Sequence, residues 1–206
     1  MPTLTRPDFD ISYPYTVTAG PGVFFRKITA PPFFLSSGTI TPSLLVIPSE
    51  DQSSTVGFYS FLWAPHLPEL IPSGSFAVGV AVLQSSRYFS PTTGSAYAFE
   101  YHWVNGQYRL LKTINGVNTA TTLRSGNTFV HLNGDDYPIS LLWFVDPQGE
   151  WTYLEARIGD VLLLQYQDFD TPYITGVCQS SYFNDGGSAS PFHIAFSQAE
   201  MHGRIR

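Results

Sequence analysis

The sequence between Tyr97 and Phe183 alternates short apolar segments with turn residues. Asn105-Gly106, Asp146–Gly149 and Gly159-Asp160 each separate two apolar segments of strand length, and Asn, Asp and Gly accept the backbone angles that tight turns need. No window in this stretch keeps an uninterrupted helical period of hydrophobic residues. The pattern predicts a meander of antiparallel strands.

Within that meander, the strand predicted over Trp151–Ile158 alternates aliphatic residues with aromatic and charged ones. The aromatic and charged positions are Trp151, Tyr153, Glu155 and Arg157. In Tyr97–Val104, Glu100 and His102 share a face, where we expect a solvent-facing pair. Exposed rings beside paired charges suit sugar stacking with hydrogen bonds, or a protein interface with aromatic and arginine anchors. A third interpretation is that Trp151 and Tyr153 pack under the N-terminal segment.

The next predicted strand, Gln107–Asn115, also alternates. One set of its positions is Gln107, Arg109, Leu111 and Thr113, and the opposite set is Tyr108, Leu110, Lys112 and Ile114. The sequence has a lysine only at Lys27 and Lys112. The two sets of positions are expected on opposite faces of the strand.

The order of these pieces resembles a known family. An aromatic-rich strand, a short Asn-Gly turn, YRLLKTINGV, a Thr-rich hairpin, ISLLWFVDPQGEWTYLEARIGDVLLLQYQD and TPYITGVCQ follow one another. This order is similar to the second half of laminin-G-like, concanavalin A-like lectin/glucanase domains, with Asp168 to Gly176 as the closing element. The resemblance covers residues 75–205 and implies a two-sheet jelly roll. It leaves open whether this chain binds sugar.

Residues 1–50 differ in composition from the rest, because they contain half of the 16 prolines. Proline fixes φ and has no N–H donor, so we expect no long central strand here, only short ones near Val23–Ile28 and Leu44–Ile47. Large rings are frequent nevertheless, and a solvated linker would not carry them. They include Phe9, Tyr13, Tyr15, Phe24, Phe25, Phe33 and Phe34. We expect these rings to clasp a neighbouring subunit, or alternatively to pack as the first edge of this domain's own sheet.

We therefore predict an all-β fold, a two-sheet antiparallel jelly-roll sandwich with an extended Pro-rich N-terminal arm. The arm is residues 1–50, and the concanavalin A-like domain is residues 51–206. The segment His193–Met201 is expected to close one sheet as an edge strand. Cys178 is the single cysteine, so no internal disulfide is possible, and its apolar surroundings in the sequence favour a small buried side chain.

Charge and hydropathy narrow the range of partners. A net charge of −6 would repel phosphate backbones, which argues against nucleic acid. No apolar run approaches the length of a membrane span, so we expect no membrane insertion. The opening MPTLTRPDFD has no basic-then-apolar leader, and we expect no signal peptide.

Motifs for chemistry are few. Glucanases of this fold family place carboxylates in a Glu-x-Asp-x-Glu pattern, but no glutamate here has an acidic residue two positions later. We therefore expect no enzyme and no cofactor. Asp168 and Asp170 are a weak calcium candidate, and their alternative role is to end a strand in side-chain turns.

Two functions remain. The first is a structural module, such as a virion capsid-decoration or tail-associated protein, which acts as a homo-oligomer among protein neighbours and faces outward from a virion or a cytoplasmic assembly. The alternative is a lectin-like adhesin that recognises a cell-surface glycan.

Overall fold

The computed structural model describes the backbone of residues 3–6, 9–12, 15–20, 23–36, 44–50, 56–65, 77–86, 93–102, 105–127, 137–176, 178–184 and 193–204. Side chains are described within 77–86, 93–102, 105–117, 119–127 and 138–176, and at Gln179 and Tyr182. All structural statements below concern these residues.

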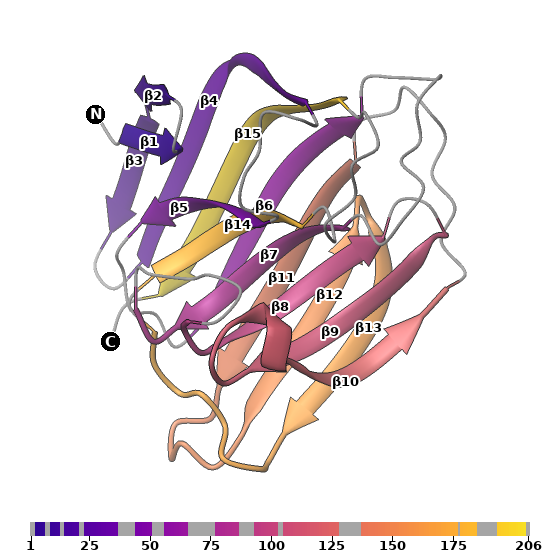
Figure 1. The fold of residues 1–206 in the computed structure, drawn as a ribbon. Helices are drawn as coiled ribbons and strands as arrows, with labels where there is room; N and C mark the ends of the chain where they lie inside the picture. The colour runs from indigo at the N-terminus through magenta and orange to yellow at the C-terminus, as the bar shows by residue number, and fades with distance from the viewer. Residues whose placement is uncertain are drawn as a thin grey trace.

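Two large antiparallel sheets make up most of the described chain (Figure 1). The six-stranded sheet has the order β10 (Thr121–Gly126), β9 (Gln107–Thr113), β8 (Ala96–His102), β7 (Ala77–Gln84), β14 (Cys178–Asn184), β5 (Leu44–Glu50). The seven-stranded sheet has the order β13 (Val161–Asp168), β12 (Thr152–Ile158), β11 (Tyr137–Val145), β6 (Val56–Pro65), β15 (His193–Arg204), β4 (Val23–Ser36), β3 (Tyr15–Gly20). A separate hairpin joins β1 (Thr3–Arg6) to β2 (Phe9–Ser12), and η1 (Val117–Thr119) is a single 3-10 turn.

The prediction of an all-β, two-sheet sandwich is confirmed. Glycines at the predicted turns adopt the positive φ angles that those turns require, with φ of 66° at Gly106, 78° at Gly149 and 55° at Gly159. The alternation predicted for residues 151–158 is also confirmed, since buried and half-buried residues alternate along β12.

The core lies between the two sheets and is built from the inward-facing residues of both. Val80 of β7 and Phe99 of β8 from one sheet, and Trp143 of β11 and Leu154 of β12 from the other, are completely buried. Each such side chain contributes about 1.5–3 kcal/mol through removal of its apolar surface from water. At one open side, the edge strands β10 and β13 approach each other, and the Arg124 guanidinium lies 5.8 Å from the centroid of the Tyr166 ring.

Two strand predictions are wrong. β4 spans 14 residues and lies between β3 and β15, whereas only short strands were expected in this Pro-rich segment. Its two prolines, Pro31 and Pro32, lie where the β4–β15 register shifts and beyond the part of β4 that pairs with β3, so they remove no ladder hydrogen bond. β15 is not an edge strand, because β4 and β6 pair with its two sides.

Among the described residues, no helix is long and apolar enough to cross a bilayer. The side chains of residues 1–50 and of Cys178 lie outside the described residues, so the arm's grip on a neighbour and the burial of Cys178 stay predictions.

Candidate functional site

The outer face of the seven-stranded sheet carries a connected row of polar and aromatic side chains, here called the β12 surface: Trp151, Tyr153, Glu155 and Arg157, with Gln165 of β13. Arg157 donates from Nε to Glu155 Oε1 at 2.6 Å, and its Nη2 lies 2.5 Å from the same oxygen. The Tyr153 hydroxyl donates to Glu155 Oε2 at 3.2 Å and accepts from Gln165 Nε2 at 2.6 Å. Three of the four contact residues predicted on this strand, Tyr153, Glu155 and Arg157, are thus linked with Gln165 in one network.

Strand pairing produces this arrangement. Glu155 is directly opposite Gln165 in the β12–β13 ladder, and every second residue of β12 points to the same side. Trp151 lies at the end of the row, where its ring packs against Phe144 of β11 with centroids 5.5 Å apart. Trp151 and Tyr153 are half-buried, and the Arg157 side chain is 38% exposed. The β12 surface is therefore held in place by its own contacts and partly accessible to solvent.

The charges on the β12 surface shift the acid–base behaviour of two groups. Partial burial raises the pKa of Glu155, but the hydrogen bond and positive charge of Arg157 outweigh it and hold that pKa below its usual range. Burial and the neighbouring Glu155 raise the pKa of Tyr153. At neutral pH the row therefore presents an ionised carboxylate and a protonated phenol.

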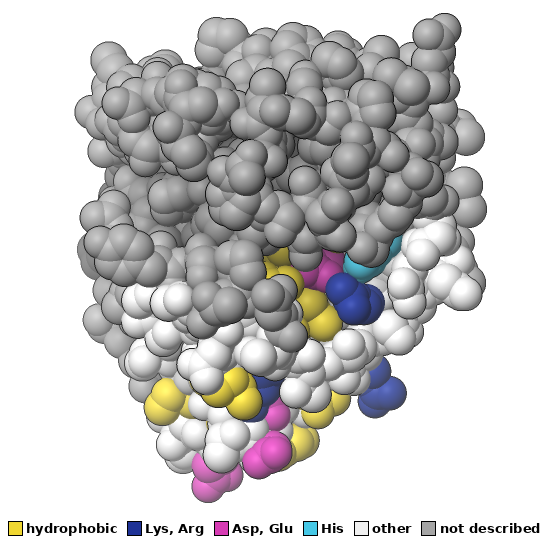
Figure 2. All heavy atoms as spheres, viewed as in Figure 1, with side chains coloured by type: hydrophobic (Ala, Val, Ile, Leu, Met, Phe, Trp, Pro, Cys, Tyr) yellow, Lys and Arg dark blue, Asp and Glu magenta, His cyan; other side chains and the backbone are white. Residues whose placement is uncertain are grey.

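A second carboxylate cluster lies on the outer face of the six-stranded sheet. Glu100 accepts from Arg109 Nη2 at 2.6 Å and from the Tyr182 hydroxyl at 2.8 Å. His102 Nε2 lies 3.5 Å from the same carboxylate. These residues come from β8, β9 and β14. In the space-filling view of Figure 2, acidic, basic and histidine side chains lie together beside hydrophobic ones.

The prediction that Glu100 and His102 form a solvent-facing pair is wrong. Glu100 is completely buried and His102 is 7% exposed. The alternation assigned them correctly to a face other than that of Tyr97 and Phe99, but every residue of β8 is buried, so this outer face is covered as well. Glu100 and His102 also lie on a different sheet from the β12 surface, so the predicted contact residues do not form one site.

The environment of Glu100 keeps it charged. Complete burial raises its pKa, but His102, Arg109 and the Tyr182 hydroxyl together outweigh this effect, so the pKa is lowered overall. Burial and the charge of Glu100 in turn raise the pKa of Tyr182 far above its usual value. The cluster is therefore a hydrogen-bonded ion pair whose carboxylate is completely buried.

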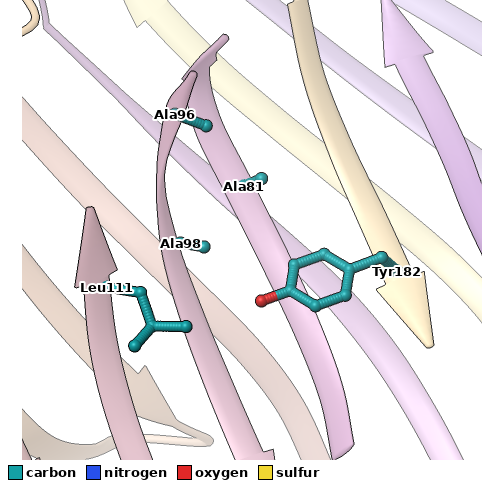
Figure 3. Close-up of a cluster of buried hydrophobic side chains, with 5 residues drawn as sticks. All are labelled: Ala81, Ala96, Ala98, Leu111 and Tyr182. Carbon is teal, nitrogen blue, oxygen red and sulfur yellow. The ribbon is translucent and has the colours of Figure 1, made fainter. Parts of the chain in front are cut away.

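Tyr182 reaches Glu100 by lying across Gly79, the residue between them in the strand order. A Cβ at Gly79 would come within 2.3 Å of the Tyr182 ring, so only glycine leaves room for the ring. Small side chains on the neighbouring strands also leave room for the ring. Figure 3 shows the Tyr182 ring projecting from its strand toward Ala81 and Ala98. This packing explains why a buried tyrosine accompanies a glycine on the adjacent strand.

A third polar cluster joins the two sheets near the end of β13. Asp168 accepts from Lys112 Nζ at 2.6 Å and from the Tyr97 hydroxyl at 2.5 Å. Burial, followed by the hydrogen bond to Asp168, raises the pKa of Tyr97, which keeps this hydroxyl protonated. Asp168 was predicted as half of a calcium candidate, and here its Oδ2 contacts an ammonium group instead. Among the described residues, no three His, Cys, Asp or Glu side chains are grouped as metal ligands.

Sequence reasoning missed three residues that complete these clusters. Gln165 was not singled out, because only its pairing opposite Glu155 gives it a role. Tyr182 and Gly79 lie about a hundred positions apart, and only their register in the sheet brings them together.

Comparison with protein-family models and with curated proteins finds no match. Among solved structures, the potassium-bound carbohydrate recognition domain of Emp46p has a TM-score of 0.55 at 9% identity, over 93% of this chain and 89% of that one. The VIP36 exoplasmic/lumenal domain in its Ca²⁺/Man3GlcNAc-bound form has a TM-score of 0.54 at 9% identity, over 85% of this chain and 84% of that one. Together with the two observed sheets, these likenesses show that the chain has the fold of the concanavalin A-like lectins and glucanases.

Proposed function

We propose that this chain is a carbohydrate-binding domain, without catalytic activity, that recognises a glycan through the β12 surface. The observation that carries the proposal is a half-buried Trp151 at the end of a hydrogen-bonded row of tyrosine, carboxylate, guanidinium and amide groups. A sugar presents an apolar C–H face and a rim of hydroxyls, and this surface offers a partner for each.

The two ends of the β12 surface would contact different parts of a sugar. The Trp151 ring, which packs against Phe144, supplies an apolar surface for a pyranose. Arg157 and Gln165 supply N–H donors, and Glu155 accepts from sugar hydroxyls. Because Glu155 is already fixed by Arg157 and Tyr153, little side-chain entropy is lost when a ligand binds.

The fold comparison supports binding rather than catalysis. The Emp46p structure is a carbohydrate recognition domain, and the VIP36 structure contains Man3GlcNAc, although both share only 9% identity with this chain. The exposure of the β12 surface favours it over the Glu100 cluster as the contact region, since Glu100 has no surface that a ligand could touch.

A glycan array followed by titration of the best ligand tests the proposal. We expect specific binding by the wild-type chain, and a loss of at least about tenfold in affinity for Trp151→Ala, because stacking on an aromatic ring is worth about 1–3 kcal/mol. Phe169→Ala is the matched control, because Phe169 is 66% exposed but lies outside the β12 surface. Absence of any bound glycan, or equal affinity of Trp151→Ala and the wild type, would overturn the proposal.

A further inference from the structure

Lys112 is held like a bound cation. Its Nζ lies 2.6 Å from Asp168 Oδ2, 2.5 Å from the carbonyl oxygen of Asp170 and 3.0 Å from that of Thr171. An ammonium group has three N–H donors and no acceptor, so these three oxygens satisfy it completely. The rings of Tyr173 and Tyr97 lie 5.1 Å and 5.9 Å from Nζ, within the range of cation–π attraction.

The chain positions these oxygens through contacts of its own. The Asp170 N–H donates to Asp168 Oδ1 at 3.0 Å, which folds the chain after β13 into a side-chain turn. The Tyr173 N–H donates to the Tyr97 hydroxyl at 3.0 Å, and Thr152 Oγ1 donates to the Tyr173 carbonyl at 2.8 Å. These contacts do not involve the lysine, so the oxygen cage has support that remains when the ammonium is removed.

The composition of the cage indicates a single positive charge. Its only ionised ligand is Asp168, whose side chain is 2% exposed, and the Lys112 side chain is 12% exposed. Calcium takes six to eight oxygen ligands and favours several carboxylates. One carboxylate, two carbonyls and two ring faces suit a monovalent cation, for which ring faces are also attractive.

We propose that Asp168, Asp170 and Thr171 form a monovalent-cation site that Lys112 fills with its own ammonium group. The Lys112 ammonium, which is covalently attached to β9, then fixes the segment that follows β13. A chain without this ammonium would bind a free cation in its place, either a primary alkylammonium ion or potassium. The proposal is independent of carbohydrate binding.

Chemical rescue of Lys112→Ala tests the site. Alanine removes three methylenes and the ammonium, so propylammonium replaces the missing atoms. Urea unfolding is followed by tryptophan fluorescence in sodium, potassium, propylammonium, tetramethylammonium and calcium chlorides at one ionic strength. We expect propylammonium to restore most of the urea midpoint that the substitution loses, potassium to restore part of it, and tetramethylammonium, which has no N–H donor, to resemble sodium.

Two further variants make the result specific. The wild type, whose site is filled, and Lys112→Ala/Asp168→Asn, whose cage has no charge, should not distinguish propylammonium from sodium. Equal midpoints of Lys112→Ala in all salts, or the same rescue in the double variant, would overturn the proposal, and a larger effect of calcium than of potassium would overturn its monovalent character. If Lys112→Ala does not fold in sodium, the yield of refolding in each salt decides in the same way.

Discussion

Glu100 with Arg109 and Glu155 with Arg157 are the same chemical pair on the outer faces of two different sheets. The arginine side chains are similarly exposed, 33% for Arg109 and 38% for Arg157. The carboxylates differ: Glu100 is completely buried and also accepts from the Tyr182 phenol, whereas the Glu155 side chain is 14% exposed. Both carboxyl groups have lowered pKa values, and in both the charged partners outweigh partial or complete burial.

The difference shows that accessibility, rather than residue type, separates a structural ion pair from a binding surface. A buried carboxylate whose oxygens are satisfied within the chain stabilises the packing of three strands. The same group at a surface costs little to keep, contributes little to stability and remains available to a ligand.

The largest expected effect follows removal of the buried carboxylate. Glu100→Ala leaves Arg109 and the buried Tyr182 hydroxyl without their acceptor, and we expect a loss of about 3 kcal/mol in the free energy of unfolding. Glu155→Ala is the matched control and should cost at most about 1 kcal/mol. Urea denaturation of both variants measures the difference, and similar losses would remove the distinction between the two pairs.

Gly79→Ala should act on the same cluster indirectly. The new methyl group would meet the Tyr182 ring, displace it and weaken its hydrogen bond to Glu100, at a cost of about 1–3 kcal/mol. In a Tyr182→Ala background the ring is absent, so the same glycine substitution should cost clearly less. Additive losses in the double-mutant cycle would show that the glycine is needed for another reason.

The pH dependence of stability should follow the buried carboxylate. Because the pKa of Glu100 is lower in the folded chain than its ordinary value of 4.5, its ionisation stabilises the fold above that pH, and this contribution is lost as the pH falls through the folded-state pKa. Each unit of lowering corresponds to about 1.4 kcal/mol. Thermal unfolding between neutral and acidic pH should therefore show a flatter dependence for Glu100→Gln than for the wild type, and an unchanged slope would contradict this role.

The smallest effect on stability is expected for Arg157→Ala, at most about 1 kcal/mol, because its ion pair is partly exposed to solvent. The same substitution removes the guanidinium donors of the β12 surface and leaves only the Gln165 amide, so affinity for a glycan found on the array should fall. A variant that loses stability but keeps full affinity would assign Arg157 to folding instead of recognition.

The sequence predicted the faces of single strands well. In β12, charged and aliphatic residues alternate strictly, so both faces were identifiable before the sheets were known. Lys112 is also informative in retrospect, because its alternation placed a rare lysine with Tyr108 and Leu110 on the face that proves to be inward.

What the sequence did not predict is how strands combine. Alternation separated Glu100 from Tyr97 but could not show that both faces of β8 are buried. The contacts of Tyr182 with Glu100, and of Lys112 with Asp168, join residues separated by 82 and 56 positions, and they depend on strand order and register. Short-range patterns contain no information about either.

The positions of β14 and β15 have a consequence for synthesis on the ribosome. β5 pairs with the six-stranded sheet through β14, and β3 and β4 pair with the seven-stranded sheet through β15. β3, β4 and β5 are therefore translated early but can join their sheets only after β14 and β15 have been translated. Contacts of such long sequence separation form slowly. The nascent chain spends most of its translation time with these early strands unincorporated, which makes this interval the one in which a chaperone would matter most.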